Sequence, residues 1–280
     1  MALTDCHTHT EISPDSEAKI ADMFTAAQNA GLAAYAVTDH IELCRWYPQG
    51  YYKTQPRNEE DFYDYAVRFE LSMAQNLMMR EQCPEDMAFV CGIEMGEPDV
   101  DWKLSSRIYL DERLDFVIAS LHELQGKLDF YFLDYTKEDM EALLDRYFND
   151  LHAIAQHDCY DVLGHITYPL RYIEGEAGIR VKHERCREAA AEIFRAAIAL
   201  GKGIELNTSG YRQKYGKPFP DETLLRLYKD LGGTILTLGS DAHKPEDVAG
   251  GIAQGADLAR ACGFEKVCYY QKHEPHFITL

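Results

Sequence analysis

Imidazole and carboxylate side chains stand at the ends of successive short apolar segments of this chain. They are His7, His9, Asp39, His40, Glu94, His122, His165, Asp241 and His243. Nitrogen and oxygen ligands of these types bind divalent ions such as Zn, Mn and Fe. Ions of this kind lower the pKa of a bound water and so support hydrolysis. The set therefore predicts a site for metal-dependent hydrolytic chemistry.

The spacing within the set strengthens this interpretation. Residues two apart on a strand point to the same side, so His7 and His9 can grip one ion, and Asp241 and His243 repeat that spacing. Each motif alone is weak, because a strand-end Asp-His pair can cap a helix and a single histidine such as His122 is more often structural. The hypothesis rests on the conjunction, since six of the eleven histidines follow apolar segments.

The elements that must position these residues alternate between short apolar and longer helical patterns. The expected strands are residues 2–6, 33–38, 88–94, 116–121, 161–166, 203–207, 234–239 and 266–270. The expected helices are residues 17–30, 59–82, 137–157, 182–200, 221–231 and 245–260. Such alternation predicts an α/β fold of parallel strands, closed or nearly closed into a barrel whose strand ends meet at one rim. An open doubly wound sheet is the alternative.

The composition limits the domain count and the partners. The chain has 280 residues, 46% of them hydrophobic, which suffices for one core, and we expect a single domain over residues 1–280. The formal charge of −19 disfavours nucleic-acid binding. A small anionic substrate remains acceptable, because bound cations and a few placed arginines reverse the local field.

Cysteine usage and the terminal sequence predict a cytoplasmic protein. The eight cysteines are scattered without a C-x-x-C pair, which is typical of reduced thiols. The first residues lack a basic flank followed by an apolar stretch, and no apolar run is long enough to span a bilayer, so neither a signal peptide nor a membrane partner is expected.

Two long connections are expected near the rim. One covers residues 41–58 and contains Trp46 and a Tyr-rich stretch over 47–52, and the other covers residues 167–180. Long loops in compact domains are often lids or binding loops. The first either covers the site or packs against a second subunit, so formation of a homo-oligomer is left open.

The chain resembles the PHP family, named for polymerase and histidinol phosphatase. The resemblance rests on the order of its motifs, which are H-x-H at His7, D-H at Asp39, Glu94, His122, His165 and D-x-H at Asp241. The resemblance runs from His7 to about Gly250. It implies a distorted (β/α)7 TIM-like barrel with a trinuclear metal site. Within the family the chain is most similar to the histidinol-phosphate phosphatases, in residues 7–15, 120–123, 162–165 and 205–212.

The resemblance also implies how the metal ligands divide among three ions. The implied ligands are His7, His9, Glu94 and Asp241 for the first ion, Glu94, His122 and His165 for the second, with Glu94 bridging, and His40 and His243 for the third. At the position of Asp15 the family commonly has a third-site histidine. Aspartate is a harder ligand, which favours Mn or Fe or weakens this site, so two or three ions are expected.

The activity implied by the resemblance is hydrolysis of a phosphate monoester, L-histidinol phosphate, in histidine biosynthesis. A metal-activated hydroxide is expected to attack phosphorus, while Arg171 and Arg212 contact the phosphate and either Asp15 or His243 protonates the leaving group. The substrate would then be a small phosphorylated metabolite. Carboxylates expected near its ammonium and imidazole groups are Glu42, Glu97 and Glu123.

Three other interpretations share parts of this pattern. Another PHP phosphoesterase acting on a sugar or nucleotide phosphate would differ in the loop from Tyr168 to Arg180 and at Tyr211 and Arg212. A non-catalytic PHP scaffold is disfavoured, because chains that lose catalysis usually lose ligands. A metal-dependent amidohydrolase on a similar barrel is disfavoured too, because those enzymes commonly use a lysine where this chain has Glu94.

Overall fold

The structure, a computed structural model, describes residues 3–44 and 64–280. Trp46 and the Tyr-rich stretch 47–52, predicted to cover the site or an interface, lie outside the described residues.

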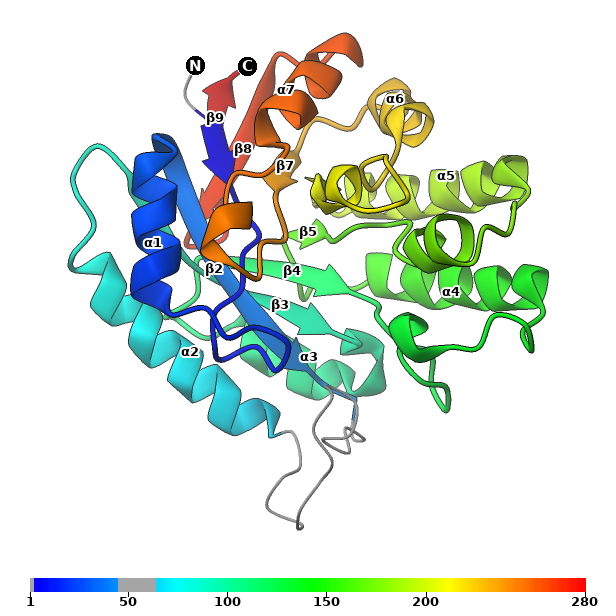
Figure 1. The fold of residues 1–280 in the computed structure, drawn as a ribbon, viewed down its shortest axis with the longest axis horizontal. Helices are drawn as coiled ribbons and strands as arrows, with labels where there is room; N and C mark the ends of the chain where they lie inside the picture. The colour runs from blue at the N-terminus through cyan, green and yellow to red at the C-terminus, as the bar shows by residue number, and fades with distance from the viewer. Residues whose placement is uncertain (1–2, 45–63) are drawn as a thin grey trace.

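Seven parallel strands form one sheet in sequential order (Figure 1). They are β1 (Leu3–Asp5), β2 (Leu32–Glu42), β3 (Ala88–Gly96), β4 (Phe116–Ser120), β5 (Val162–Leu163), β6 (Gly203–Asn207) and β7 (Leu236–Gly239). The sheet curls until its edge strands meet, where the Cys6 N–H donates to the Leu238 carbonyl at 2.8 Å and the Asp241 N–H donates to the His7 carbonyl at 2.8 Å. The nearly closed barrel predicted from the alternating pattern is therefore confirmed, and its strands are buried on both faces, as parallel strands are.

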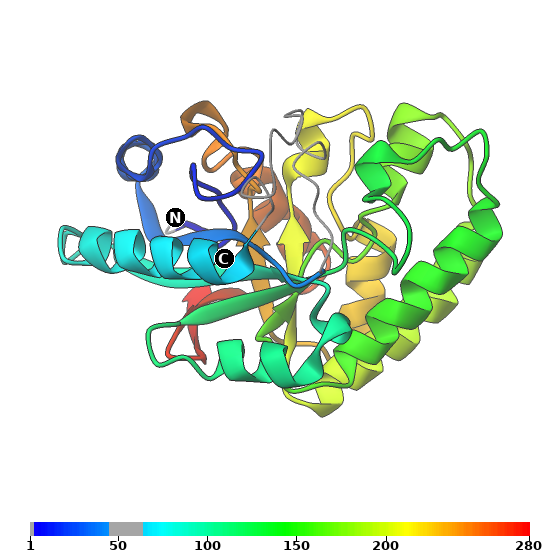
Figure 2. The same cartoon turned by 90° about the horizontal axis from the view of Figure 1, so that it is seen from below.

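Helices cover the outside of this barrel. They are α1 (Ile20–Asn29), α2 (Tyr65–Arg80), α3 (Trp102–Tyr109), α4 (Met140–Ala155), α5 (His183–Ala199), α6 (Glu222–Asp230) and α7 (Ile252–Ala261). Figures 1 and 2 show α1 and α2 on one flank and α4 and α5 on the other. In the described ranges, no helix combines the length and apolarity needed to cross a membrane.

Local chemistry sets where several helices begin. The side chains of Asp64, Asp101, Asp139 and Asp221 accept backbone N–H groups at the starts of α2, α3, α4 and α6. The expected helix over residues 245–260 is instead a 3₁₀ turn, η7 (Pro245–Asp247), followed by α7. Left-handed backbone at Ala249 (φ 60°) and Gly251 (φ 79°) separates the two, which a helix does not accommodate.

The eighth expected strand does not join the parallel sheet. β8 (Lys266–Gln271) pairs antiparallel with β9 (Glu274–Thr279) in a hairpin, through left-handed turn residues Lys272 (φ 52°) and His273 (φ 63°). Its Cys268 and Tyr270 pack against Phe116 and other residues at the amino ends of the barrel strands. The hairpin therefore fills the end of the barrel opposite to the rim where the polar residues gather.

Candidate metal centre

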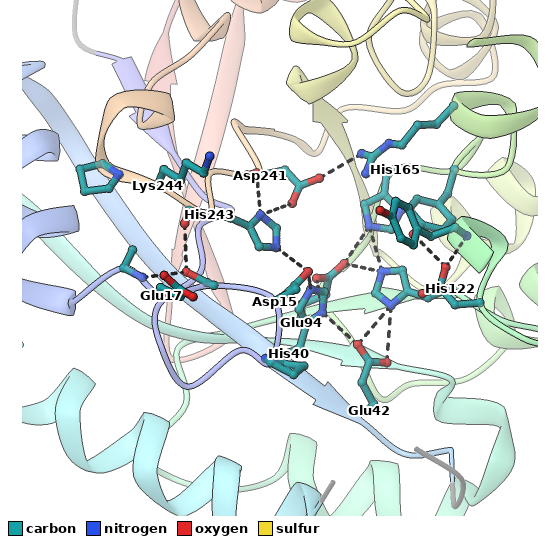
Figure 3. Close-up of a pocket in the computed structure, with 18 of the residues that line it drawn as sticks. Asp15, Glu17, His40, Glu42, Glu94, His122, His165, Asp241, His243 and Lys244 are labelled. Carbon is teal, nitrogen blue, oxygen red and sulfur yellow. Dashed lines mark hydrogen bonds and ion pairs between the residues drawn. The ribbon is translucent and has the colours of Figure 1, made fainter. Parts of the chain in front are cut away.

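Strand register brings the predicted ligands together at the carboxyl ends of the strands. His40 on β2 lies opposite Glu94 on β3, and a bridge between Thr8 and Ala242 places His7 and His9 beside the segment after β7. Figure 3 shows six of these side chains pointing into one pocket, namely His40, Glu94, His122, His165, Asp241 and His243. The nine ligands that the resemblance implies, Asp15 included, take part in this cluster. Asp39, the other candidate in the sequence, does not, because its carboxylate accepts hydrogen bonds from Thr10, Ser13 and Ser72.

Glu94 is the centre of the cluster. Its Oε1 lies 2.7 Å from His165 Nε2 and 3.1 Å from His122 Nε2, whereas its Oε2 lies 3.2 Å from His7 Nε2 and 3.0 Å from His40 Nδ1. The carboxylate is fully buried. Its two oxygens therefore face different sets of imidazoles, which is the arrangement that a bridging ligand requires (Figure 3).

A second group of contacts surrounds Asp241. Its Oδ1 lies 3.4 Å from His9 Nε2 and 3.6 Å from His243 Nδ1. The His9 ring stacks on both His40 and His243, with centroids 4.2 and 4.1 Å apart. Asp15 Oδ2 lies 3.0 Å from His243 Nε2 and 3.6 Å from His40 Nε2. Asp15, which stands where the family commonly has a histidine, thus lies within reach of His40 and His243, the residues predicted to bind the third ion.

The donor atoms fit divalent cations. Within the predicted ligand set, four groups have one ligand atom per residue, all within 4.8 Å of one another: His7, Glu94 and His165; His7, His9 and Asp241; His40, Glu94 and His122; and His9, His40 and His243. His7 Nε2, His9 Nε2 and Glu94 Oε2 are buried and make no hydrogen bond to the described residues. Buried donor atoms that face each other without a hydrogen bond are satisfied by a cation between them.

The electrostatics keep the carboxylates in their ligand form. Burial raises the pKa of the Glu94 carboxyl, but the imidazoles of His7, His122 and His40 outweigh burial and hold this pKa well below its usual value. At Asp241, burial raises the pKa as well, and His7 with the Arg171 guanidinium brings it well below normal. Both side chains are therefore anionic at neutral pH.

A second layer of carboxylates orients the imidazoles, and this role was not predicted from the sequence for any of them. Glu205 Oε1 lies 2.6 Å from His7 Nδ1, and Glu42 Oε1 lies 3.2 Å from His122 Nδ1 and 2.9 Å from His40 Nδ1. Such partners fix the ring orientation of metal-binding histidines. A polar Glu205 two residues before Asn207, within a buried strand, was the available signal for Glu205.

The cluster opens into a cavity of about 830 Å³. Besides the ligand set, its walls contain Arg171, Lys244, Tyr168, Tyr172 and Phe132. Glu42 lines this cavity, whereas Glu97 does not, and Glu97 Oε1 accepts the backbone N–H groups of His122 and Glu123 at 2.8 and 3.2 Å. The structure thus gives Glu97 a loop-fixing contact, and substrate recognition by these glutamates stays a prediction.

Arg171 faces the metal cluster. It begins the π-helix η5 (Arg171–Glu176), and its guanidinium donates to Asp241 Oδ2 at 3.1 Å and to Ser209 Oγ at 2.8 Å. It also lies over the Tyr168 ring, 5.0 Å from the centroid. A buried guanidinium held at the edge of the cavity is suited to bind a phosphate oxygen.

Arg212, the second predicted phosphate ligand, is placed differently. Its guanidinium donates to the carbonyls of Ser240 at 2.8 Å and Gly250 at 3.1 Å, and it pairs with Asp247 at 3.3 Å. It is not among the described residues that line the cavity. Arg212 braces the segment around Asp241, whose backbone is left-handed (φ 54°), and its phosphate contact stays a prediction.

Known proteins of this architecture share nearly the whole chain. The histidinol-phosphatase of Lactococcus lactis is 27% identical, with 96% of this chain and 95% of the relative covered. A probable histidinol-phosphatase of Thermotoga maritima is 24% identical, with 94% of each chain covered. The crystal structure of the Lactococcus lactis histidinol phosphate phosphatase, complexed with Zn, L-histidinol and phosphate, superimposes with a TM-score of 0.76, at 25% identity and 98% coverage of both chains.

A family match covers most of the residues that build the rim. The PHP domain matches residues 5–209, which begin two residues before His7 and include Glu94, His122 and His165. With this match over more than half of its length, and with the predicted ligands gathered around Glu94, the chain belongs to the PHP domain family.

Proposed function

We propose that this chain is a metal-dependent phosphomonoester hydrolase that acts on L-histidinol phosphate in histidine biosynthesis, in the cytoplasm. The observation that carries the proposal is the buried Glu94, whose two oxygens face four imidazoles at the floor of a cavity. The relative from Lactococcus lactis, crystallised with Zn, L-histidinol and phosphate, supports the substrate. We take residues 1–280 as one barrel domain, because the β8–β9 hairpin packs onto the barrel end.

The centre would hold two or three divalent ions of Zn, Mn or Fe. The residues that would hold them are His7, His9, Asp15, His40, Glu94, His122, His165, Asp241 and His243. Bound there, the ions lower the pKa of a water molecule and neutralise charge on phosphate oxygens. Asp15 is the most exposed of these residues, with 37% of its side chain exposed, and it lies 3.0 Å from His243 and 3.6 Å from His40.

The chain's own groups would position the substrate and supply a proton. Arg171 donates to a phosphate oxygen from the cavity wall, and Tyr168 holds its guanidinium in place. With only two ions bound, Asp15 and His243, 3.0 Å apart and both on the cavity wall, would deliver a proton to the departing alcohol oxygen, whereas with a third ion they would act as its ligands. Arg212 reaches the phosphate only after its bonds to the carbonyls of Ser240 and Gly250 break.

The test combines metal analysis with a substrate panel. Protein purified without chelator is expected to contain divalent metal and to release phosphate from L-histidinol phosphate with a kcat/KM orders of magnitude above that for sugar and nucleotide phosphates. Chelator should abolish this activity, and added metal should restore it. If the protein binds metal but its activity is low and indiscriminate, the histidinol-phosphate assignment is wrong and a PHP phosphoesterase with another substrate remains. If the protein contains no metal and added metal restores no activity, the whole proposal is overturned.

A further inference from the structure

The loop between β1 and α1 contains a buried hydroxyl that touches one candidate metal ligand and the backbone of another. Ser13 Oγ lies 3.0 Å from His9 Nδ1, and it accepts the backbone N–H of His40 at 3.0 Å. It also donates to Asp39 Oδ1 at 3.0 Å. The exposed fraction is 1% for Ser13 and 0% for His9 and Asp39, so water does not substitute for these contacts.

The direction of each hydrogen bond follows from the partners of Asp39. Its carboxylate accepts the Thr10 N–H at 2.7 Å, the Thr10 hydroxyl at 2.9 Å, the Ser72 hydroxyl at 2.7 Å and the Gln75 amide at 3.2 Å. All of these partners donate, so Asp39 acts as an acceptor only. The single hydroxyl proton of Ser13 therefore points to Asp39.

The second lone pair of Ser13 Oγ determines which nitrogen of His9 carries the proton. A hydroxyl oxygen has two lone pairs, and one of them takes the His40 N–H. The other faces His9 Nδ1, so this nitrogen must carry the proton and donate it. A neutral imidazole with its proton on Nδ1 has its lone pair on Nε2, which lies 3.5 Å from Glu94 Oε2 and 3.4 Å from Asp241 Oδ1.

We infer that Ser13, held by Asp39, is a positioning residue that fixes His9 as the Nδ1–H tautomer and so presents His9 Nε2 to a divalent cation. The inference rests on the metal centre of the proposed function. Ser13 contacts neither substrate nor ion, and it acts through His9. The same hydroxyl holds the backbone of His40, so one side chain aligns two stacked ligands whose ring centroids are 4.2 Å apart.

The support for Ser13 reaches outside the barrel. Ser72 and Gln75, which donate to Asp39, belong to α2, and Thr10 belongs to the loop that continues to Asp15. The Ser13 N–H also donates to the Thr10 carbonyl at 2.9 Å, which fixes the loop as a turn. The hydroxyl is thereby placed by both the helix layer and the ligand-bearing loop.

The first experiment compares metal affinity in Ser13→Ala with the wild type. Loss of a contact of this kind typically weakens metal binding by about 10–100-fold. Zn affinity is measured by competition with a chromophoric chelator, which requires no catalytic turnover. The matched control is Ser105→Ala, because Ser105 is also fully buried but its hydroxyl donates to the Trp102 carbonyl on α3. We expect wild-type affinity in the control, and a Ser13→Ala affinity within threefold of wild type would overturn the inference.

The second experiment reads the tautomer directly and does not depend on a variant that folds. Long-range ¹H–¹⁵N correlation spectra of metal-free wild-type protein with ¹⁵N-labelled histidine should show His9 protonated on Nδ1. A His9 that carries its proton on Nε2 would overturn the inference. Failure of the proposed function looks different. Without a metal centre, wild-type protein would bind no metal at all, whatever the tautomer, and a wrong substrate would appear only in the substrate panel.

Discussion

Glu205 Oε1 lies 2.6 Å from His7 Nδ1, with both side chains buried, and the other carboxylate oxygen of Glu205 accepts the backbone N–H of His165 at 2.9 Å. One carboxylate on β6 thus orients an imidazole from β1 and fixes the strand end that presents a second one. Neither contact is local in sequence.

Replacing Glu205 with Gln should weaken metal binding without emptying the site. The amide still fills the space, but the charge-assisted bond to His7 is lost, and we expect Zn affinity to fall by about 10–100-fold. Chelator competition measures the affinity. Glu192→Gln is the control, because that side chain is 62% exposed on α5 and pairs with Arg195. Equal affinities in the two variants would contradict the role of Glu205.

Gly239 at the end of β7 leaves room for this same contact. A Cβ added there would lie 2.1 Å from Glu205 Oε1 and 2.5 Å from the His7 Cβ. We expect Gly239→Ala to lower the free energy of unfolding of the metal-free protein by about 1–3 kcal/mol and to weaken metal binding as well. Urea unfolding and chelator competition measure the two effects. A variant with the unfolding free energy and the metal affinity of the wild type would contradict the prediction, because Glu205 and His7 would then have moved apart at little cost in free energy.

The two predicted phosphate arginines should separate in an inhibition experiment. Arg171 lines the cavity, whereas Arg212 is bonded to backbone carbonyls. We expect Arg171→Ala to raise the inhibition constant of inorganic phosphate by at least about tenfold, which is the loss of a charged hydrogen bond of roughly 1.5–3 kcal/mol. Arg212→Ala should change that constant less than about threefold while lowering the melting temperature. An equal rise in both variants would restore the direct phosphate contact of Arg212.

Asp99 should make stability depend on pH in the opposite sense to a salt-bridged carboxylate. Burial, with a smaller contribution from Asp150, raises its pKa to about 6, and its Oδ1 has no hydrogen-bond partner among the described residues. The folded state therefore holds a proton that the unfolded state releases near pH 4, so this group costs stability as pH rises from about 4 to 6. The cost is fully present at pH 7.

The variant Asp99→Asn removes this cost. Urea unfolding of chelator-treated protein should show the variant about 1–2 kcal/mol more stable than wild type at pH 7, with the advantage gone at pH 4. Asp134→Asn is the comparison, because Lys137 and Thr136 hold the pKa of the exposed Asp134 at about 2, and its loss should not stabilise the protein. A variant no more stable than wild type at pH 7 would contradict the prediction.

The ligand set could be predicted because its signal is local. Each ligand follows a short apolar segment, and a parallel barrel carries all such ends to one rim, so His9 and His243 meet although 234 positions separate them in the numbering. The second layer was harder, because Glu205, Ser13 and Glu42 acquire their roles from contacts that depend on how the strand ends come together.

The errors have similar physical origins. The segment that became β8 has the apolar pattern of a barrel strand, and only its antiparallel partner β9 reveals the hairpin. Left-handed backbone at Ala249 interrupts the helix expected over residues 245–260, and an alanine in the sequence does not indicate such a conformation. Arg171 and Arg212, whose phosphate contacts stay predictions, look equivalent in the sequence, since each lies a few residues past a strand end. Their side-chain partners, Asp241 and Ser209 for Arg171 and backbone carbonyls for Arg212, place the two guanidinium groups differently.

The β8–β9 hairpin closes the end of the barrel opposite to the metal centre. Its aromatic and thiol side chains pack among the strand starts. In the described structure, substrate and products are therefore expected to enter and leave through the cavity over the metal centre. Phosphate would rest on the floor beside Arg171, with the alcohol product between it and the opening. We therefore expect ordered departure, alcohol first, so that phosphate inhibits competitively against substrate and the alcohol noncompetitively.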